Sequence, residues 1–166
     1  SFVTPREDVS AITLTDEQRQ VCDAVAADLE GGFKPTLLFG ITGSGKTIVY
    51  CHLAQQTLDR GRTVLVLTPE IAITGAMLAY FRGFFGKEVT VIHSAMTDRE
   101  RLDSWQGIRQ GRYRIVIGPR SALFAPLRRL GLIVVDEEHD DSYKQDDPSP
   151  RFHGRDAAVM RAKLAG

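Results

Sequence analysis

A glycine-rich segment that ends in lysine and threonine is the first feature of the chain that could do chemistry. It runs from Gly40 to Thr47 and reads Gly-Ile-Thr-Gly-Ser-Gly-Lys-Thr. Glycines let the backbone fold tightly, so that successive N–H groups point at phosphate oxygens. A helix that begins near Lys46 would add the positive end of its dipole. The pattern G-x-x-x-x-G-K-[ST] therefore predicts a phosphate-binding loop.

Each residue type in this loop has a separate expected task. Lys46 would reach the β- and γ-phosphates of ATP, and the Thr47 hydroxyl would coordinate Mg²⁺. A glycine-rich turn can match the pattern by chance, but this one lies between an apolar segment, 36–39, and a helical pattern, which is the context a phosphate loop needs. The rest of the expected cradle consists of small residues: Gly40, Thr42, Gly43, Ser44 and Gly45.

Two adjacent carboxylates follow a second apolar segment. Asp136 and Glu137 end the run 132–135, and carboxylates at the carboxyl edge of a parallel sheet face the same crevice as a phosphate loop. Asp136 is the expected Mg²⁺ ligand, acting mainly through water, and Glu137 the expected base for the attacking water. Because acidic residues continue to position 141, a solvated acidic turn is the alternative. The upstream phosphate loop favours the catalytic interpretation.

The elements that must position these residues alternate between short apolar runs and amphipathic segments. This alternation predicts an α/β fold, a mostly parallel sheet flanked by helices on both faces. Capping boxes predict helix starts at Thr15 and Thr97, and a third helix is expected over 46–60, ending at Gly61. Residues 140–150 read as a loop, and a helical pattern precedes residue 164. The expected strands are Thr36–Phe39, Thr63–Thr68, Val89–His93, Arg114–Ile117 and Leu132–Val135.

Composition limits the class of protein. A chain of 166 residues forms one domain with a buried core, and its 43% hydrophobic and 25% charged residues are those of a globular protein. Its 21 basic residues balance 21 acidic ones, so any nucleic-acid contact must use a local patch. The two cysteines have no metal-ligand spacing and suit a reducing compartment. No apolar run approaches the roughly 20 residues of a membrane span, so we expect a cytoplasmic protein without a membrane partner.

Several further motifs resemble those of one family. The relevant segments are Thr68-Pro69-Glu70, His93-Ser94, the stretch 117–126 with Arg120-Ser121, the Asp-Glu-Glu-His-Asp sequence 136–140, and Ser142-Tyr143-Lys144-Gln145. Together with the phosphate loop they resemble the superfamily 2 DExH helicases, and most closely the primosomal replication-restart helicases (the PriA family). The resemblance covers residues 14–162. It implies a RecA-like lobe, the first of two motor lobes.

The resemblance implies roles for residues outside the nucleotide site. The segments at 68–70 and 120–121 look like helicase motifs Ia and Ib, which line the path of single-stranded DNA, and His139 is expected to sense the nucleotide state. An aromatic-rich loop after the DExH box would couple DNA contact to hydrolysis. The alternatives are a helix start at Pro69, an ordinary surface Arg120, and a loop whose Phe152 packs on the core. The expected DNA-binding residues are Thr68, Pro69, Glu70, His93, Ser94, Arg120, Ser121, Tyr143, Lys144 and Phe152.

Three positions fit the family pattern less simply. Gln18 resembles the glutamine that reads adenine in related helicases, but it is also the N3 residue of a capping box that starts at Thr15. Pro119 stands where the family has threonine, which removes a hydroxyl and a backbone donor from the expected DNA path. The stretch 74–77 departs from the usual Thr-Pro-Gln. These departures concern the DNA contacts and not the ATP site.

The ends of the chain read as cuts in a longer protein. Residues 1–13 would be a linker from a preceding DNA-binding domain, and 14–166 the ATP-binding lobe, truncated before motif III. The resemblance places the second motor lobe, its arginine finger and a zinc-binding insertion beyond the chain, so zinc is expected only there. Because an arginine finger contributes roughly 10³–10⁵ in rate, the lobe alone is expected to hydrolyse ATP barely.

The resulting hypothesis is the ATP-binding lobe of a 3′-to-5′ DNA helicase that acts in replication restart. Its expected partners are single-stranded or forked DNA, the second motor lobe, single-stranded DNA-binding protein, and primosome or helicase-loader proteins. Three alternatives remain open. They are the first lobe of another superfamily 2 translocase, a P-loop phosphotransferase that needs no DNA, and a non-catalytic module that uses nucleotide only as a structural ligand.

Overall fold

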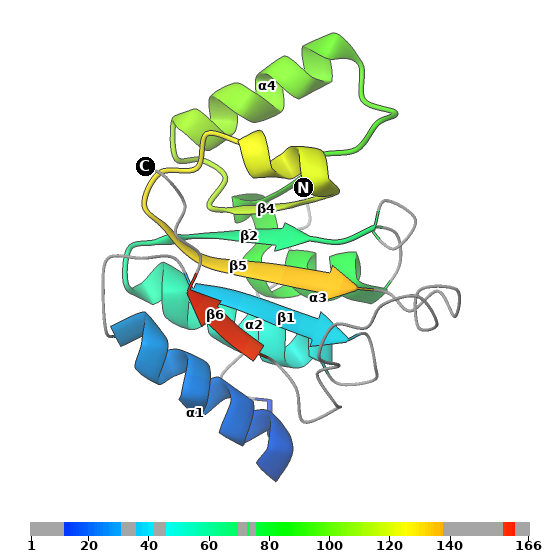
Figure 1. Ribbon diagram of the computed structural model, residues 1–166. Helices are drawn as coiled ribbons and strands as arrows, with labels where there is room; N and C mark the ends of the chain where they lie inside the picture. Colours follow the sequence, from blue (N-terminus) through cyan, green and yellow to red (C-terminus); the bar gives the residue numbers. More distant parts are fainter. Residues whose placement is uncertain are drawn as a thin grey trace.

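Five short apolar segments form the parallel part of a six-stranded sheet (Figure 1). The computed structural model describes residues 12–30, 36–41, 46–69, 73, 76–137 and 158–161. The strands are β1 (Thr36–Ile41), β2 (Thr63–Leu67), β3 (Val89–Val91), β4 (Ile115–Gly118), β5 (Leu130–Glu137) and β6 (Ala158–Arg161). Their order across the sheet is β3-β4-β2-β5-β1-β6. Only β6 runs antiparallel, against β1.

Helices cover both faces of this sheet, as the alternating pattern predicts (Figure 1). One core contains the buried side chains of α1 (Asp16–Glu30), α2 (Lys46–Asp59) and α3 (Ala76–Phe85). The other lies under α4 (Asp98–Arg109) and the 3-10 helix η4 (Arg120–Phe124). Successive residues of a strand point to opposite faces, so Val64 and Val66 join the first core while Leu65 and Leu67 join the second.

The helices begin and end at the capping residues that the sequence contains. At the start of α1, Thr15 Oγ1 accepts from the Gln18 N–H at 3.2 Å, and Gln18 Oε1 accepts from the Thr15 N–H at 2.9 Å. At the start of α4, Thr97 Oγ1 accepts from the Glu100 N–H at 3.1 Å. After α2 the chain turns at Gly61, whose φ of 72° is one that glycine adopts without strain. The predicted helix starts and the predicted C-cap are therefore confirmed.

The helix α3 and the strand β6 were not predicted, and one prediction near the end of the chain was wrong. The five predicted strands are present, with ends that differ by one or two residues. The helix α3 has a nearly continuous apolar sequence, which gives little periodicity to detect. Residues 158–161 form the strand β6, whereas the sequence pattern before residue 164 indicated a helix. Pairing with the outer edge of β1, a tertiary contact, overrides this local pattern.

Both cysteines are buried in the first core. Burial raises the pKa of the Cys22 thiol to about 11, with a smaller contribution from the charge of Asp23. Burial also raises the pKa of the Cys51 thiol. The two thiols are therefore protonated at neutral pH and act as packing groups. Among the helices of the described part, none combines the length and apolarity needed to cross a membrane.

Gly118 allows the segments after β3 and β4 to pack closely. A Cβ at this position would lie 2.8 Å from the Cβ of Ala122 and 3.1 Å from the Ile92 carbonyl oxygen. Because neither neighbour is the end of a flexible side chain, a methyl group would push η4 away from the sheet. The glycine thus fixes the position of η4, which begins at Arg120.

We predict that Gly118→Ala lowers the free energy of unfolding by about 1–3 kcal/mol, the usual cost of overpacking. The matched control is Gly83→Ala within α3, where a Cβ would meet nothing within 4 Å. This control should raise the free energy of unfolding by roughly 0.5–1 kcal/mol, because alanine is the better helix former. Urea denaturation of both variants measures the difference, and equal effects would contradict the close-packing argument.

Candidate functional site

The predicted phosphate loop and the predicted carboxylates start from neighbouring strands. In the β1–β5 ladder, Gly40 lies opposite Asp136, and Ile41 lies opposite Glu137. The two strands are parallel, so their carboxyl ends share one edge of the sheet. The chain therefore enters the segment 42–45 directly beside the two acidic positions.

A buried hydrogen bond joins the helix after the loop to Asp136. The Tyr50 hydroxyl donates to Asp136 Oδ1 at 3.0 Å. Lys46 begins α2 and lies four residues before Tyr50, so the two share one side of the helix. This contact brings the first turns of α2, with the half-buried Lys46 and Thr47, to the side of the sheet where Asp136 lies.

Both partners of this hydrogen bond are buried. Asp136 is 1% exposed and Tyr50 is buried in the first core. Burial raises the pKa of the Tyr50 hydroxyl, and the charge of Asp136 and the hydrogen bond to it raise this pKa further. Tyr50 therefore stays protonated at physiological pH and can serve as a donor to a charged acceptor, which is the stronger kind of hydrogen bond.

The oxygen ligands at this edge fit Mg²⁺ better than a transition metal. Within the described ranges, no three His, Cys, Asp or Glu side chains gather where they could hold a metal. Mg²⁺ needs no such cage, since it is usually bound by one or two carboxylates together with substrate phosphates and water. Asp136 and Thr47, the predicted ligands, carry oxygen atoms of the kind that Mg²⁺ prefers. The described residues thus agree with a metal that arrives with a nucleotide.

The residues expected to contact DNA follow the neighbouring strands at the same edge. Thr68 follows β2, the pair 93–94 follows β3, and the pair 120–121 follows β4. Pro69, Ser94 and both residues of the 120–121 pair are exposed, and His93 is half-buried. Thr68 is 3% exposed and its hydroxyl has no hydrogen-bond partner among the described residues. Its N–H donates to the Gly118 carbonyl at 3.0 Å, so the backbone of Thr68 continues the pairing of β2 with β4. The Thr68 side chain is not part of the exposed surface.

Other predicted site residues cannot be placed. The side chain of Glu137 is not described, although its backbone closes β5. The remaining ones lie outside the described residues: Thr42, Gly43, Ser44, Gly45, Glu70, His139, Tyr143, Lys144 and Phe152.

Gln18 has a structural task in the chain. Its Oε1 accepts the Thr15 N–H and so closes the capping box of α1. A glutamine that reads adenine uses its carbonyl oxygen and its amino group together. The structure therefore shows the capping interpretation of Gln18, and the adenine interpretation stays a prediction.

Comparison with known proteins identifies the family to which the chain belongs. The family model described as "Type III restriction enzyme, res subunit" matches residues 11–157. The chain belongs to this family. The matched residues include both the predicted phosphate loop and the acidic pair, which start from the paired strands β1 and β5.

The curated relatives that match the chain include replication restart proteins from several bacteria. Replication restart protein PriA of Chlamydia pneumoniae is 46% identical over 153 residues, which are 92% of this chain and 20% of the relative. The PriA of Bacillus subtilis is 42% identical over 153 residues, 92% of this chain and 19% of the relative. That of Haemophilus influenzae is 48% identical over 132 residues, 80% of this chain and 18% of the relative. The predicted resemblance to PriA helicases is confirmed, and the chain spans about a fifth of the length of these relatives.

A solved structure supports the fold. RecG, in a structure bound to a three-way DNA junction, superposes with a TM-score of 0.59 at 21% identity. The match covers 78% of this chain and 21% of RecG. Together with the family match, this similarity confirms the prediction of a RecA-like α/β lobe.

Tyr50 was not predicted as a site residue, although the sequence contains a signal for it. Tyr50 lies one helical turn after Lys46, where a helix residue faces the same side as the lysine. A tyrosine on the buried side of a helix needs a partner for its hydroxyl. What the sequence does not give is the identity of that partner, because Asp136 lies 86 residues away.

We predict that Tyr50→Phe lowers the free energy of unfolding by about 1.5–3 kcal/mol, the usual contribution of a hydrogen bond to a charged group. Tyr113→Phe is the matched control, because the Tyr113 hydroxyl makes no hydrogen bond to any described residue and its ring is only partly buried. This control should change stability by less than about 0.5 kcal/mol. Chemical denaturation at pH 7 compares the two, and a Tyr50→Phe variant as stable as its control would show that the bond contributes nothing.

Proposed function

We propose that this chain is the ATP-binding lobe of a DNA helicase that acts in replication restart. One observation carries the proposal: Gly40 and Ile41 pair with Asp136 and Glu137, so the start of the phosphate loop and both acids share one edge. The Tyr50–Asp136 hydrogen bond supports it, because it holds the helix that begins with Lys46 against the same carboxylate. The similarity to PriA proteins adds the biological context.

The proposed chemistry gives separate roles to five side chains. Lys46 would balance the charge on the β- and γ-phosphates of ATP, and Glu137 would take the proton of the attacking water. Thr47 and Asp136 would hold Mg²⁺, which supplies neutralisation of the phosphate charge. Tyr50 would keep the Asp136 carboxylate oriented by its hydrogen bond. ATP would be cleaved to ADP and phosphate.

DNA would cross the other part of the same edge. The residues after β2, β3 and β4 would contact the phosphates of a single strand without reading its sequence. Exposed Arg120 and Ser121 suit this role. The buried Thr68 side chain suits it only if the edge opens when DNA binds, so its contribution would come after a local rearrangement. His139, Tyr143, Lys144 and Phe152 keep their proposed coupling and DNA roles.

The finer features of the proposal come from the resemblance. They are 3′-to-5′ unwinding, action on stalled or forked DNA, and contacts with a second motor lobe, with single-stranded DNA-binding protein and with helicase-loader proteins. We place this activity in the cytoplasm. A P-loop phosphotransferase is not favoured, because the family match and the PriA relatives extend through the DExH segment.

Lys46→Ala tests the nucleotide site. A fluorescent ATP analogue in the presence of Mg²⁺ should bind the chain, and the variant should bind at least about tenfold more weakly, since a charge-assisted phosphate contact contributes about 1.5–3 kcal/mol. Arg99→Gln, a charge removal at an exposed position in the first turn of α4, is the control and should bind as the parent does. Equal affinity of the Lys46→Ala variant would contradict the assigned phosphate contact.

Glu137→Gln separates binding from hydrolysis. In a full-length helicase that carries this lobe, the variant should retain ATP binding and lose nearly all DNA-stimulated hydrolysis and unwinding, because glutamine keeps the shape of the side chain but cannot accept the proton. Steady-state phosphate release and strand-separation assays measure the two activities. Persistent unwinding would mean that another residue acts as the base.

A further inference from the structure

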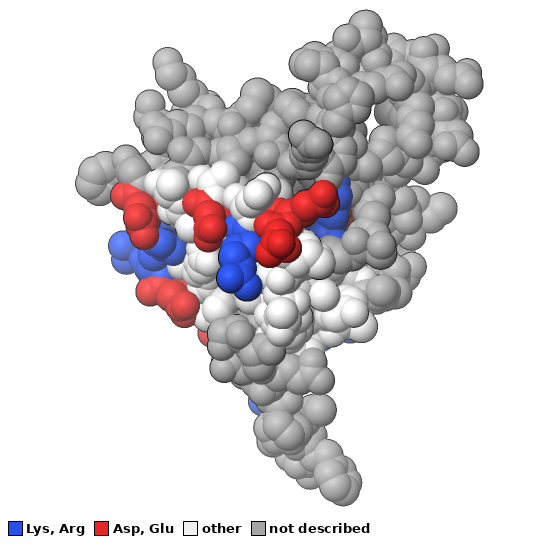
Figure 2. All heavy atoms as spheres, turned by 90° about the horizontal axis from the view of Figure 1, so that it is seen from below, with Lys and Arg blue, Asp and Glu red and all other residues white. Residues whose placement is uncertain are grey.

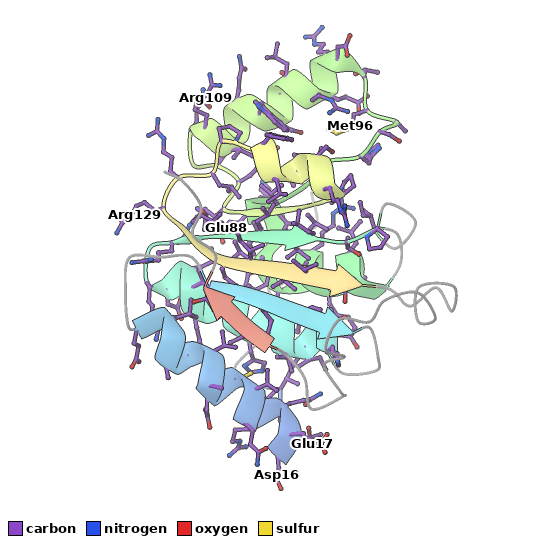
Figure 3. The ribbon with its side chains drawn as sticks, in the orientation of Figure 1. Asp16, Glu17, Glu88, Met96, Arg109 and Arg129 are labelled. Carbon is purple, nitrogen blue, oxygen red and sulfur yellow. The ribbon has the colours of Figure 1, made fainter. Side chains whose placement is uncertain are left out.

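Basic residues gather at the edge of the sheet opposite the candidate site. The connections that lead into β2, β3, β4 and β5 carry seven basic residues, and Arg109, the last residue of α4, directly precedes one of these connections as an eighth. Because the four strands are parallel neighbours, these connections lie side by side. Backbone hydrogen bonds tie them together: the Thr63 N–H donates to the Arg129 carbonyl at 3.0 Å, and the Arg114 N–H donates to the Glu88 carbonyl at 2.9 Å. Figure 3 shows Arg109 and Arg129 on this side of the molecule.

Two of the eight have structural partners. Arg60 pairs with Glu30 at 3.2 Å and donates to the Gln56 carbonyl at 3.0 Å. Arg114 lies 3.7 Å from Glu88 and donates to the Leu58 carbonyl at 2.6 Å. These contacts satisfy the carboxyl end of α2, so the two arginines need no external ligand.

The other six form a surface that we call the arginine rim. Its members are Arg62, Lys87, Arg109, Arg112, Arg128 and Arg129. Within the described residues, none of them forms an ion pair. Asp59, the remaining acidic neighbour, accepts a hydrogen bond from Gln55 at 2.7 Å. By contrast, the face covered by α1 carries acidic side chains beside a few basic ones (Figure 2). A chain with no net charge thus has one strongly positive edge.

The backbone at Arg129 gives a second reason to treat the rim as functional. With φ at 55°, Arg129 is the one non-glycine residue of the described part in the left-handed region. Glycine or asparagine is ordinarily found at such a position, because a Cβ there is strained. The strain is accompanied by an exposed guanidinium, which lies 3.8 Å from the position that a Cβ on Gly61 would occupy. Strained residues at exposed turns are often those that contact a ligand.

The chemistry of the rim favours the phosphates of duplex DNA over other polyanions. Five of its six members are arginines, whose planar fork matches phosphate oxygens. The row crosses β5, β2, β4 and β3, about 14 Å at ordinary strand spacing. A duplex carries on the order of eight phosphate charges over that length.

The same surface is poorly suited to a single strand or an acidic peptide. Binding of single strands uses exposed aromatic rings, but Tyr113 is half-buried and Arg112 lies 5.7 Å above its ring. Peptide sites need apolar anchors, and the exposed large apolar residues of the described part, Tyr80, Leu102, Leu123 and Phe124, are in helices and not in the connections that form the rim.

We propose that the arginine rim binds the phosphate backbone of duplex DNA, at the sheet edge opposite the nucleotide site and the single-strand path. This inference goes beyond the proposed function and needs no nucleotide. A duplex on this edge would be held by the same lobe that contacts the unwound strand on the other edge.

The test compares variants of the chain for binding to a fluorescent blunt duplex of about 20 base pairs. In Arg128→Gln/Arg129→Gly the glycine suits the left-handed backbone, so the thermal unfolding midpoint should not fall. We expect the dissociation constant at low salt to rise about tenfold, and the slope of log K against log salt to become shallower by about two. Arg19→Gln/Arg99→Gln removes two exposed arginines from the amino-terminal turns of α1 and α4 and should leave both values unchanged.

Two further measurements distinguish this proposal from the proposed function. Lys46→Ala should bind the duplex as the parent chain does, and the rim variant should bind the fluorescent nucleotide normally. Loss of nucleotide binding alone would therefore leave the rim proposal intact. Unchanged duplex binding by the rim variant would overturn it, and so would an equal loss in the control. A rim variant that loses binding of an acidic peptide or of a single strand more than it loses binding of the duplex would overturn it as well.

Discussion

The parallel pairing of β1 with β5 is the constraint on which the rest of the structure depends. Parallel strands are joined by crossover connections, so all of them end at the same edge of the sheet. The residues that follow the strands, to which the proposed chemistry is assigned, therefore lie at that edge. The pairing of Gly40 with Asp136 brings together groups that are almost a hundred residues apart in the chain. Shifting that register by one residue would exchange the faces on which the side chains lie, so the two hydrophobic cores maintain the site.

Strand order then divides the sheet among three tasks. The neighbouring strands β1 and β5 carry the groups assigned to nucleotide, while β2, β4 and β3 carry those assigned to a single strand. Between the two sets lies the β2–β5 ladder, a direct physical connection between them. At the opposite edge the same four neighbouring strands present the arginine rim. One sheet therefore offers two chemically different edges, and the helices fill the faces between them (Figure 1).

The sequence predicts those parts of the molecule that local chemistry decides. Glycines and Lys46 indicate a phosphate loop, and the capping residues Thr15 and Thr97 mark helix starts. Contacts between distant segments escape such reasoning. The partner of Tyr50 depends on strand order, and β6 forms because the edge of β1 is available to a segment with a helical pattern. The arginine rim is likewise invisible along the chain, where its members span positions 62 to 129 and only folding makes them neighbours.

The hydrogen bond from Tyr50 to Asp136 has a mechanical consequence. It fastens the first turns of α2 to the end of β5, so the helix that begins with Lys46 is coupled directly to the Asp136 carboxylate. A movement of one of them relative to the other would have to break a hydrogen bond between two buried groups. In the proposed nucleotide site, Lys46 and Asp136 would therefore keep their relative placement while a ligand enters or leaves.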